Sequence, residues 1–265
     1  MSFNLNGTVA HMRLGLISAL LLGFIASALS LALDSVPFGA LRERSDLHAG
    51  FFHVKIPMRD GVKLSTVIIL PLTNQTTYAA SMVRSPYGHM AMELLPCLFL
   101  SYGYAAIGQD VRGTGESEGE FSAWRSDADD AYDTMEWLTK QKWSNGKIYQ
   151  FGLSADGIST FVIATNPHPA LAGQTMIFAT GETYDTIYQG GAYIRGLVEK
   201  WIRKTVRSTE VQTKLLKAFE ANEQPSEWWD SINITNVRRN LHDIAKNVSK
   251  KNVSKLRVHC VSCVM

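Results

Sequence analysis

Cysteine is scarce in this sequence, and its charges nearly cancel. The 265 residues contain three cysteines, Cys97, Cys260 and Cys263, so they cannot all pair with one another. Cys260 and Cys263 alone lack the four ligands of a structural zinc site, and we favour a hydrophobic terminal strand with incidental cysteines. A net charge of +2 is too small to indicate a nucleic-acid partner. The histidines also lack the spacing from cysteine that a zinc site requires, so no metal and no cofactor is predicted.

One long uncharged run occurs near the N-terminus, at residues 14–33. It ends in the small-residue pattern Ser30-Leu-Ala, which is typical of a secretory signal peptide with Met12 as an alternative start. Twenty apolar residues can also span a bilayer as a membrane anchor. We favour cleavage, because Ala, Ser and Gly dilute the run. Residues 1–33 are therefore expected to be a signal peptide or a signal anchor, with the rest of the chain secreted or held on the exocytic side of a membrane.

Four Asn-X-Ser/Thr triplets agree with secretion, because they are acceptors for N-linked glycans. They begin at Asn74, Asn233, Asn247 and Asn252. Such triplets are common by chance, so their support for a secreted glycoprotein is modest.

The pattern of hydrophobic residues predicts an α/β fold with one substantial core, in agreement with 46% hydrophobic and 19% charged residues. Residues 51–57 and 63–70 are expected to form a β-hairpin with Asp60-Gly61 in its turn. Further strands are predicted at 78–83, 104–110, 147–151 and 171–180, and helices at about 89–100, 126–140 and 155–165. Strands that alternate with helices indicate a mostly parallel sheet covered on both faces, with the working groups at the carboxyl ends of strands. From about Tyr184 the chain becomes helical and rich in Trp, Arg and Lys, which indicates a cap or lid.

The hexapeptide Gly152-Leu-Ser-Ala-Asp-Gly157 lies between a predicted strand and a predicted helix. A nucleophile elbow has this arrangement, because a tight strand-to-helix turn exposes a serine hydroxyl beside the backbone N–H groups of a helix N-terminus. The general elbow pattern requires glycine two residues on either side of the serine. Gly152 fits this pattern, whereas Asp156 occupies the second glycine position. The hexapeptide alone is therefore weak evidence for Ser154 as a nucleophile.

Several neighbouring segments resemble the X-Pro dipeptidyl-peptidase and cocaine esterase family of α/β-hydrolases, in order and in spacing. They are Met58-Arg-Asp-Gly-Val-Lys-Leu64, Arg84-Ser-Pro-Tyr-Gly88, residues 109–121 (QDVRGTGESEGEF), and Trp137 to Trp143 followed by Gly146-Lys-Ile148. The resemblance is strong over residues 50–182 and loose in the predicted cap. The family elbow is Gly-x-Ser-Tyr-x-Gly, so that Gly157 takes the part of the second glycine, and Ala155 replaces the family tyrosine.

The resemblance implies an α/β-hydrolase fold and a serine hydrolase that cleaves ester or amide bonds of small molecules or peptides. It implies that Ser154 is the nucleophile and that the backbone N–H of Ala155 and the hydroxyl of Tyr87 form the oxyanion hole. The expected organisation is a hydrolase core at 50–182, a helical cap at 183–254 and a return strand at 255–265. In the family, the catalytic acid follows that strand, and this chain stops before it.

The catalytic acid and base are therefore expected to be missing, and activity to be impaired. His89, His168, His242 and His259 are available as substitutes, but each is more simply a surface or packing residue. Two hypotheses follow: a secreted serine hydrolase of which this chain is an incomplete part, or a non-catalytic glycoprotein, secreted or membrane-held, that retains the scaffold.

Other polar and aromatic residues have structural interpretations. Asp110 and Arg112 are expected to form a buried ion pair that braces a loop. Trp137 and Trp143 are expected to be core aromatics. Four acidic residues are interpreted as the solvated start of a helix, matched to its dipole, and not as a metal site. They are Asp127, Asp129, Asp130 and Asp133.

Overall fold

The computed structural model describes residues 50–88, 99–230 and 232, and the backbone of residues 257–261. Predictions for the leader at 1–33, most of the helix at about 89–100, the side chains of the three cysteines and three of the glycosylation acceptors lie outside these residues. Predictions for the side chains of His89, His242 and His259 also lie outside the described residues. Within the described part, no helix has the length and apolar character needed to cross a membrane.

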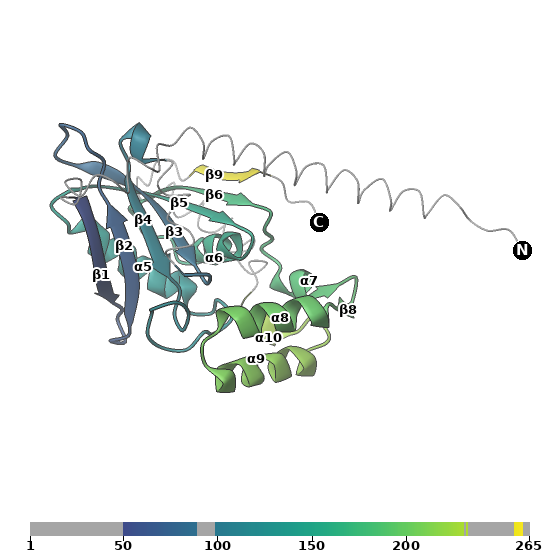
Figure 1. The fold of residues 1–265 in the computed structure, drawn as a ribbon. Coiled ribbons are helices and arrows are strands. Elements are labelled where there is room, and N and C mark those ends of the chain that lie inside the picture. The colour runs from purple at the N-terminus through teal and green to yellow at the C-terminus, as the bar shows by residue number, and fades with distance from the viewer. Residues whose placement is uncertain (1–49, 89–98, 231, 233–256, 262–265) are drawn as a thin grey trace, which may run out of the picture. The chain divides into compact units, whose positions relative to one another are not determined.

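A seven-stranded sheet forms the centre of the fold, in the order β1-β2-β4-β3-β5-β6-β9 (Figure 1). Its strands are β1 (Phe51–Pro57), β2 (Lys63–Ile69), β3 (Tyr78–Ser85), β4 (Ala105–Asp110), β5 (Ser144–Leu153), β6 (Leu171–Ile177) and β9 (Arg257–Val261). The pairs β1–β2 and β2–β4 are antiparallel. All other neighbours are parallel, which confirms the predicted sheet.

The opening hairpin is also confirmed. Its turn places Gly61 at φ +87°, a left-handed conformation that glycine adopts without steric cost. The Asp60 carboxylate accepts a hydrogen bond from the backbone N–H of Val62 at 3.2 Å, a local contact that favours the turn.

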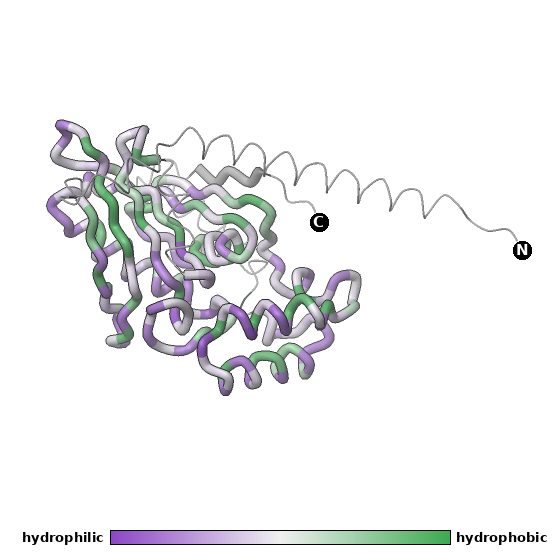
Figure 2. Tube along the Cα trace, viewed as in Figure 1, coloured by the Kyte–Doolittle hydropathy of each residue, from purple (hydrophilic) through white to green (hydrophobic). Residues whose placement is uncertain are grey.

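Helices α5 (Asp127–Thr139) and α6 (Ala155–Ile163) pack against each other and against β5. Ala131, Met135 and Leu138 form the predicted apolar stripe of α5 and are fully buried with Met82 and Ile107 of the sheet. Hydrophobic residues are concentrated along the central strands (Figure 2). Trp137 and Trp143 are only half-buried and pack at the margin of this core.

A second set of helices follows β6: α7 (Thr183–Ile187), α8 (Arg195–Thr205), α9 (Thr209–Ala221) and α10 (Glu227–Asp230), with the short hairpin β7 (Tyr188–Gln189) and β8 (Ala192–Tyr193). A short 3-10 helix, η2 (Leu100–Tyr102), precedes β4. We call residues 183–230 the helical segment. Its centre is aromatic, with Phe219 and Trp229 stacked at 5.7 Å and both nearly inaccessible to solvent. Arg207 donates to the carbonyl of Ser117, and this bond joins the segment to the loop that follows β4.

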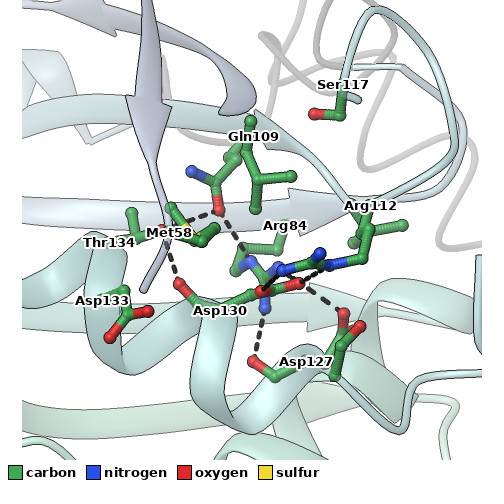
Figure 3. Close-up of polar contacts among 12 residues, drawn as sticks. Met58, Arg84, Gln109, Arg112, Ser117, Asp127, Asp130, Asp133 and Thr134 are labelled. Atoms are coloured by element: carbon green, nitrogen blue, oxygen red, sulfur yellow. Dashed lines mark hydrogen bonds and ion pairs between the residues drawn. The ribbon is translucent and has the colours of Figure 1, made fainter. Parts of the chain in front are cut away.

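Four charged residues, Arg84, Arg112, Asp127 and Asp130, form a buried ion cluster between β3 and α5 (Figure 3). The Arg84 side chain is fully buried. Its Nε donates to Gln109 at 2.8 Å and its Nη1 to the carbonyl of Asp127 at 2.6 Å. Its Nη2 lies 3.5 Å from an Asp127 carboxylate oxygen and 3.8 Å from one of Asp130. These contacts fix the end of β3 to the start of α5.

Two predictions about this region need correction. The solvated helix start is wrong for Asp127 and Asp130, each 2% exposed, because buried arginine side chains balance them. Arg112 was expected to pair with Asp110, but its ion pairs are with Asp130 and Asp60, both at 2.6 Å. The Asp110 carboxylate accepts a hydrogen bond from the backbone N–H of Glu116 at 2.7 Å and so closes the glycine-rich loop.

Candidate active site

Ser154 lies at the junction of β5 and α6, in a backbone conformation that few residues other than glycine adopt. Its φ and ψ are +58° and −122°, and its side chain is exposed. Such a conformation costs about 1–3 kcal/mol. Two backbone hydrogen bonds hold it, from the N–H of Ser154 to the carbonyl of Ile177 at 3.0 Å and from the N–H of Ile158 to the carbonyl of Ser154 at 3.1 Å. The strained turn thus presents the hydroxyl to solvent.

The two glycines of the elbow are required by close packing. A Cβ atom on Gly152 would lie 2.2 Å from the carbonyl oxygen of Asp156, and one on Gly157 would lie 2.4 Å from the Cβ of Ala179. The backbone around the elbow is therefore packed too closely for a side chain at either position. This observation gives the physical reason why the second glycine stands at position 157 and position 156 can carry a side chain.

Tyr87 is held close to Ser154. Its backbone N–H donates to Oγ of Ser85, the last residue of β3, at 3.1 Å, and its side chain lines the same pocket as Ser154. Burial raises the pKa of the Tyr87 hydroxyl, the hydrogen bond from Trp201 opposes that rise, and the charge of Asp156 adds to it. The hydroxyl therefore stays protonated near neutral pH and is able to donate.

Ala155 is the first residue of α6, so its N–H has no acceptor within the helix. The helix dipole adds partial positive charge at the same place. The structure thus brings together the three residues that the resemblance implicates: a hydroxyl on Ser154, a backbone donor on Ala155 and a phenol on Tyr87.

Asp156 is an acidic residue buried directly behind the nucleophile. It is 1% exposed, and one of its carboxylate oxygens has no hydrogen-bond partner. Burial raises the pKa of this carboxyl to about 7, opposed only by a hydrogen bond with Ser85. An unpaired buried carboxyl costs stability when ionised. The sequence gives no sign of this environment beyond the departure from the general elbow pattern.

A pocket of about 260 Å³ opens beside Ser154, between the elbow and the helical segment. Aromatic side chains form one wall, with Trp124 and Trp201 stacked at 5.4 Å and Tyr87 edge-on to Trp201 at 6.3 Å. The remaining lining is apolar apart from two threonines: Ala155, Ile158, Thr183, Thr186, Ile187, Ile194, Leu197, Val198, Ile202 and Phe219. The described lining contains no charged side chain. Sequence patterns do not identify this pocket, because its lining residues are dispersed along the chain from Tyr87 to Phe219.

Neither histidine with a described side chain lines the pocket. His168 is 7% exposed; its Nδ1 accepts from the N–H of Ala170 at 3.0 Å, which leaves Nε2 to donate to Glu136 at 3.0 Å. Nε2 of His53 lies 2.7 Å from Oγ of Ser65. His168 therefore has the packing role expected from the sequence, because both ring nitrogens are engaged at the far end of α5.

The strand order, the elbow and the donors around Ser154 define a protein with the α/β-hydrolase fold. Residues 60–255 match the family model of X-Pro dipeptidyl-peptidase (S15 family). This match covers most of the chain, which therefore belongs to that family.

Individual proteins agree with this assignment. The chain is 31% identical over 144 residues to a cocaine esterase from Rhodococcus sp., an alignment that covers 52% of this chain and 25% of the esterase. A CocE/NonD family hydrolase from Staphylococcus aureus superposes with a TM-score of 0.58 at 21% identity, over 70% of this chain and 38% of that one, which shows a shared fold. The chain spans about a quarter of the length of the curated relatives it matches.

Proposed function

We propose that this chain supplies the nucleophile and the oxyanion hole of a serine hydrolase that cleaves ester or amide bonds. The observation that carries the proposal is the strained, exposed Ser154, which lines an apolar pocket together with Tyr87 and Ala155. Family membership supports the reaction class.

The proposed reaction begins when Oγ of Ser154 attacks the carbonyl carbon of a bound substrate. The carbonyl oxygen gains negative charge, which the N–H of Ala155 and the O–H of Tyr87 stabilise. A base takes the serine proton and returns it to the departing alcohol or amine, and water then releases the acyl group by the same steps. The proposal assigns the base and its orienting acid to none of the side chains that the structure describes.

The pocket favours uncharged, apolar acyl groups over substrates with a free ammonium group. A buried ammonium needs a carboxylate partner, and the described lining has none. The Asp156 carboxyl lies behind the elbow and outside that lining. Two fluorophosphonate probes of equal length, one with a phenyl and one with an aminomethyl terminus, test this preference. Faster reaction of the ammonium probe would contradict it.

Fluorophosphonate labelling of the chain, compared with Ser154→Ala, tests the nucleophile. We expect weak labelling that disappears in Ser154→Ala, persists in Ser101→Ala and increases when imidazole supplies a base. In Tyr87→Phe, the rate should fall by about 10²–10³-fold, as for the loss of one oxyanion donor. No Ser154-dependent labelling under any of these conditions would leave the non-catalytic scaffold as the better account.

We also propose that the chain works on the exocytic side of a membrane, on the basis of its apolar N-terminal run and its glycosylation triplets. Among the acceptors, Asn74 lies within the described residues and is exposed in the loop between β2 and β3. Expression through a secretory pathway should give a glycosidase-sensitive product that becomes lighter in Asn74→Gln. A product without glycans would contradict this location.

A further inference from the structure

The Tyr87 hydroxyl has a second partner, from a distant part of the chain. Trp201 lies on α8, 114 residues from Tyr87, and its indole Nε1–H donates to the Tyr87 oxygen at 2.9 Å. The two rings meet edge to face, with an interplanar angle of 89°. Trp201 is thus a residue outside the elbow that contacts an oxyanion donor directly.

Other aromatic residues fix the Trp201 ring independently of Tyr87. Trp124 stacks on it with an interplanar angle of 23°, and Phe121 contacts it at 5.9 Å between ring centroids. Trp124 itself has a φ of +64°, a conformation that its buried surroundings must maintain. The direction of the indole N–H is therefore set by the packing of α8 on the loop before α5.

This N–H decides where the Tyr87 proton points. When the phenol oxygen accepts from Trp201, its own O–H is left to donate into the pocket that Ser154 also lines, where the oxyanion would form. Accepting a hydrogen bond also strengthens a hydroxyl as a donor, because successive hydrogen bonds polarise one another. A ring that only filled space would have neither effect.

We propose that Trp201 is a positioning residue of the oxyanion hole, which holds the Tyr87 hydroxyl against Ser154 and couples helix α8 to the reacting centre. The role of Trp201 in catalysis rests on the proposed function, whereas its hydrogen bond to Tyr87 does not depend on that function. Occupation of the pocket, which Trp201 also lines, would then act directly on the oxyanion donor.

The first test is independent of activity. The six tryptophans give six indole N–H signals in the NMR spectrum of ¹⁵N-tryptophan-labelled chain, and Trp201→Phe identifies one of them. In Tyr87→Phe, the Trp201 signal should move upfield, as a lost hydrogen bond requires, while the Trp228 signal stays in place. An unmoved Trp201 signal would overturn the proposal.

The second test uses the rate of Ser154 labelling. Trp201→Phe keeps an aromatic ring but removes the donor, and it should slow labelling by about 10-fold, the value of roughly one hydrogen bond. Trp228→Phe, which alters an indole of α10 outside the pocket, should label at the original rate. The double variant Trp201→Phe/Tyr87→Phe should label no more slowly than Tyr87→Phe.

Additive losses in the double variant would mean that Trp201 acts through packing alone, and would overturn the proposal. If the unmodified chain shows no Ser154-dependent labelling, the proposed function fails for this chain, and the NMR signal still decides whether Trp201 holds Tyr87.

Discussion

Helices α5 and α6 pack against each other, and each has a buried aspartate in its first turn. The two carboxylates differ in the partners that surround them. At the start of α5, Asp127 accepts a hydrogen bond from Ser159 at 2.6 Å and pairs with Arg84. At the start of α6, Asp156 is 1% exposed, has no arginine beside it among the described residues, and has one carboxylate oxygen without a hydrogen-bond partner. Burial raises the pKa of both carboxyls, and only at Asp127 does a cation oppose the shift.

This difference distinguishes a structural cluster, at the start of α5, from a candidate functional site, at the start of α6. The buried ion cluster pairs each carboxylate with an arginine and joins β3 to α5, so its residues are explained by stability. The elbow combines a strained serine with a buried carboxyl that has one oxygen without a partner, and both features cost stability. Unfavourable features that collect at one place indicate that function maintains them.

The largest effect is expected in the ion cluster. Arg84→Met should lower the free energy of unfolding by about 3–5 kcal/mol, because it leaves buried carboxylates without their cation. Arg59→Met removes an exposed arginine that pairs with Asp129 and Asp133, and should cost less than about 1 kcal/mol. Urea denaturation measures both. Equal losses would show that burial does not distinguish the two arginines.

Asp156→Asn should raise the free energy of unfolding, whereas Arg84→Met should lower it. The Asp156 pKa of about 7 in the folded chain exceeds the ordinary value of 3.8, so the folded state binds a proton that the unfolded state releases. Stability contributed by this group therefore falls as pH rises from about 4 to 7. The variant should be more stable than the original chain by a few kcal/mol at pH 8 and equally stable near pH 4. A gain that did not depend on pH would contradict the buried carboxyl.

Gly157→Ala tests the close approach of α6. The added Cβ would overlap Ala179, so we expect a loss of about 1–3 kcal/mol in the free energy of unfolding. Gly196→Ala provides the control, because its Cβ meets open space near the start of α8, and it should stabilise the chain by about 0.5–1 kcal/mol. Thermal unfolding measures the Tm of both variants. If both Tm values changed in the same direction, the close approach of α6 at Gly157 would be contradicted.

Ser154→Gly should give the smallest effect. Glycine adopts a φ of +58° without strain, so the variant should gain about 1 kcal/mol in the free energy of unfolding, whereas Ser154→Ala keeps the strain. Guanidinium unfolding of the two variants side by side measures the difference. Equal stability would mean that the elbow stores no strain.

The sequence predicted the parts of the fold that depend on local patterns. The hairpin at Asp60-Gly61, the apolar stripe of α5 and the parallel strands follow from turn chemistry and periodicity, and the structure confirms them. The paired glycines at 152 and 157 were predicted through the resemblance to a family, and close packing explains them.

The parts that were missed depend on contacts between distant residues. Arg84 in an otherwise uncharged strand was a signal of a buried partner, but nothing local identified Asp127 as that partner. Asp130 was expected to be solvated but is buried, because Arg112, from the loop after β4, forms an ion pair with it. The contact of Trp201 with Tyr87 left no trace in periodicity or spacing, since it depends on how α8 packs over the elbow.

Identification of the residue modified by a fluorophosphonate tests the central claim most directly. The chain would be treated to completion with imidazole present, digested, and mapped by mass spectrometry. We predict a single adduct on the peptide that contains Ser154, formed about 10²-fold or more slowly in Tyr87→Phe. An adduct on another serine, or the same rate without the Tyr87 hydroxyl, would contradict the account of the elbow as a nucleophile beside its oxyanion hole.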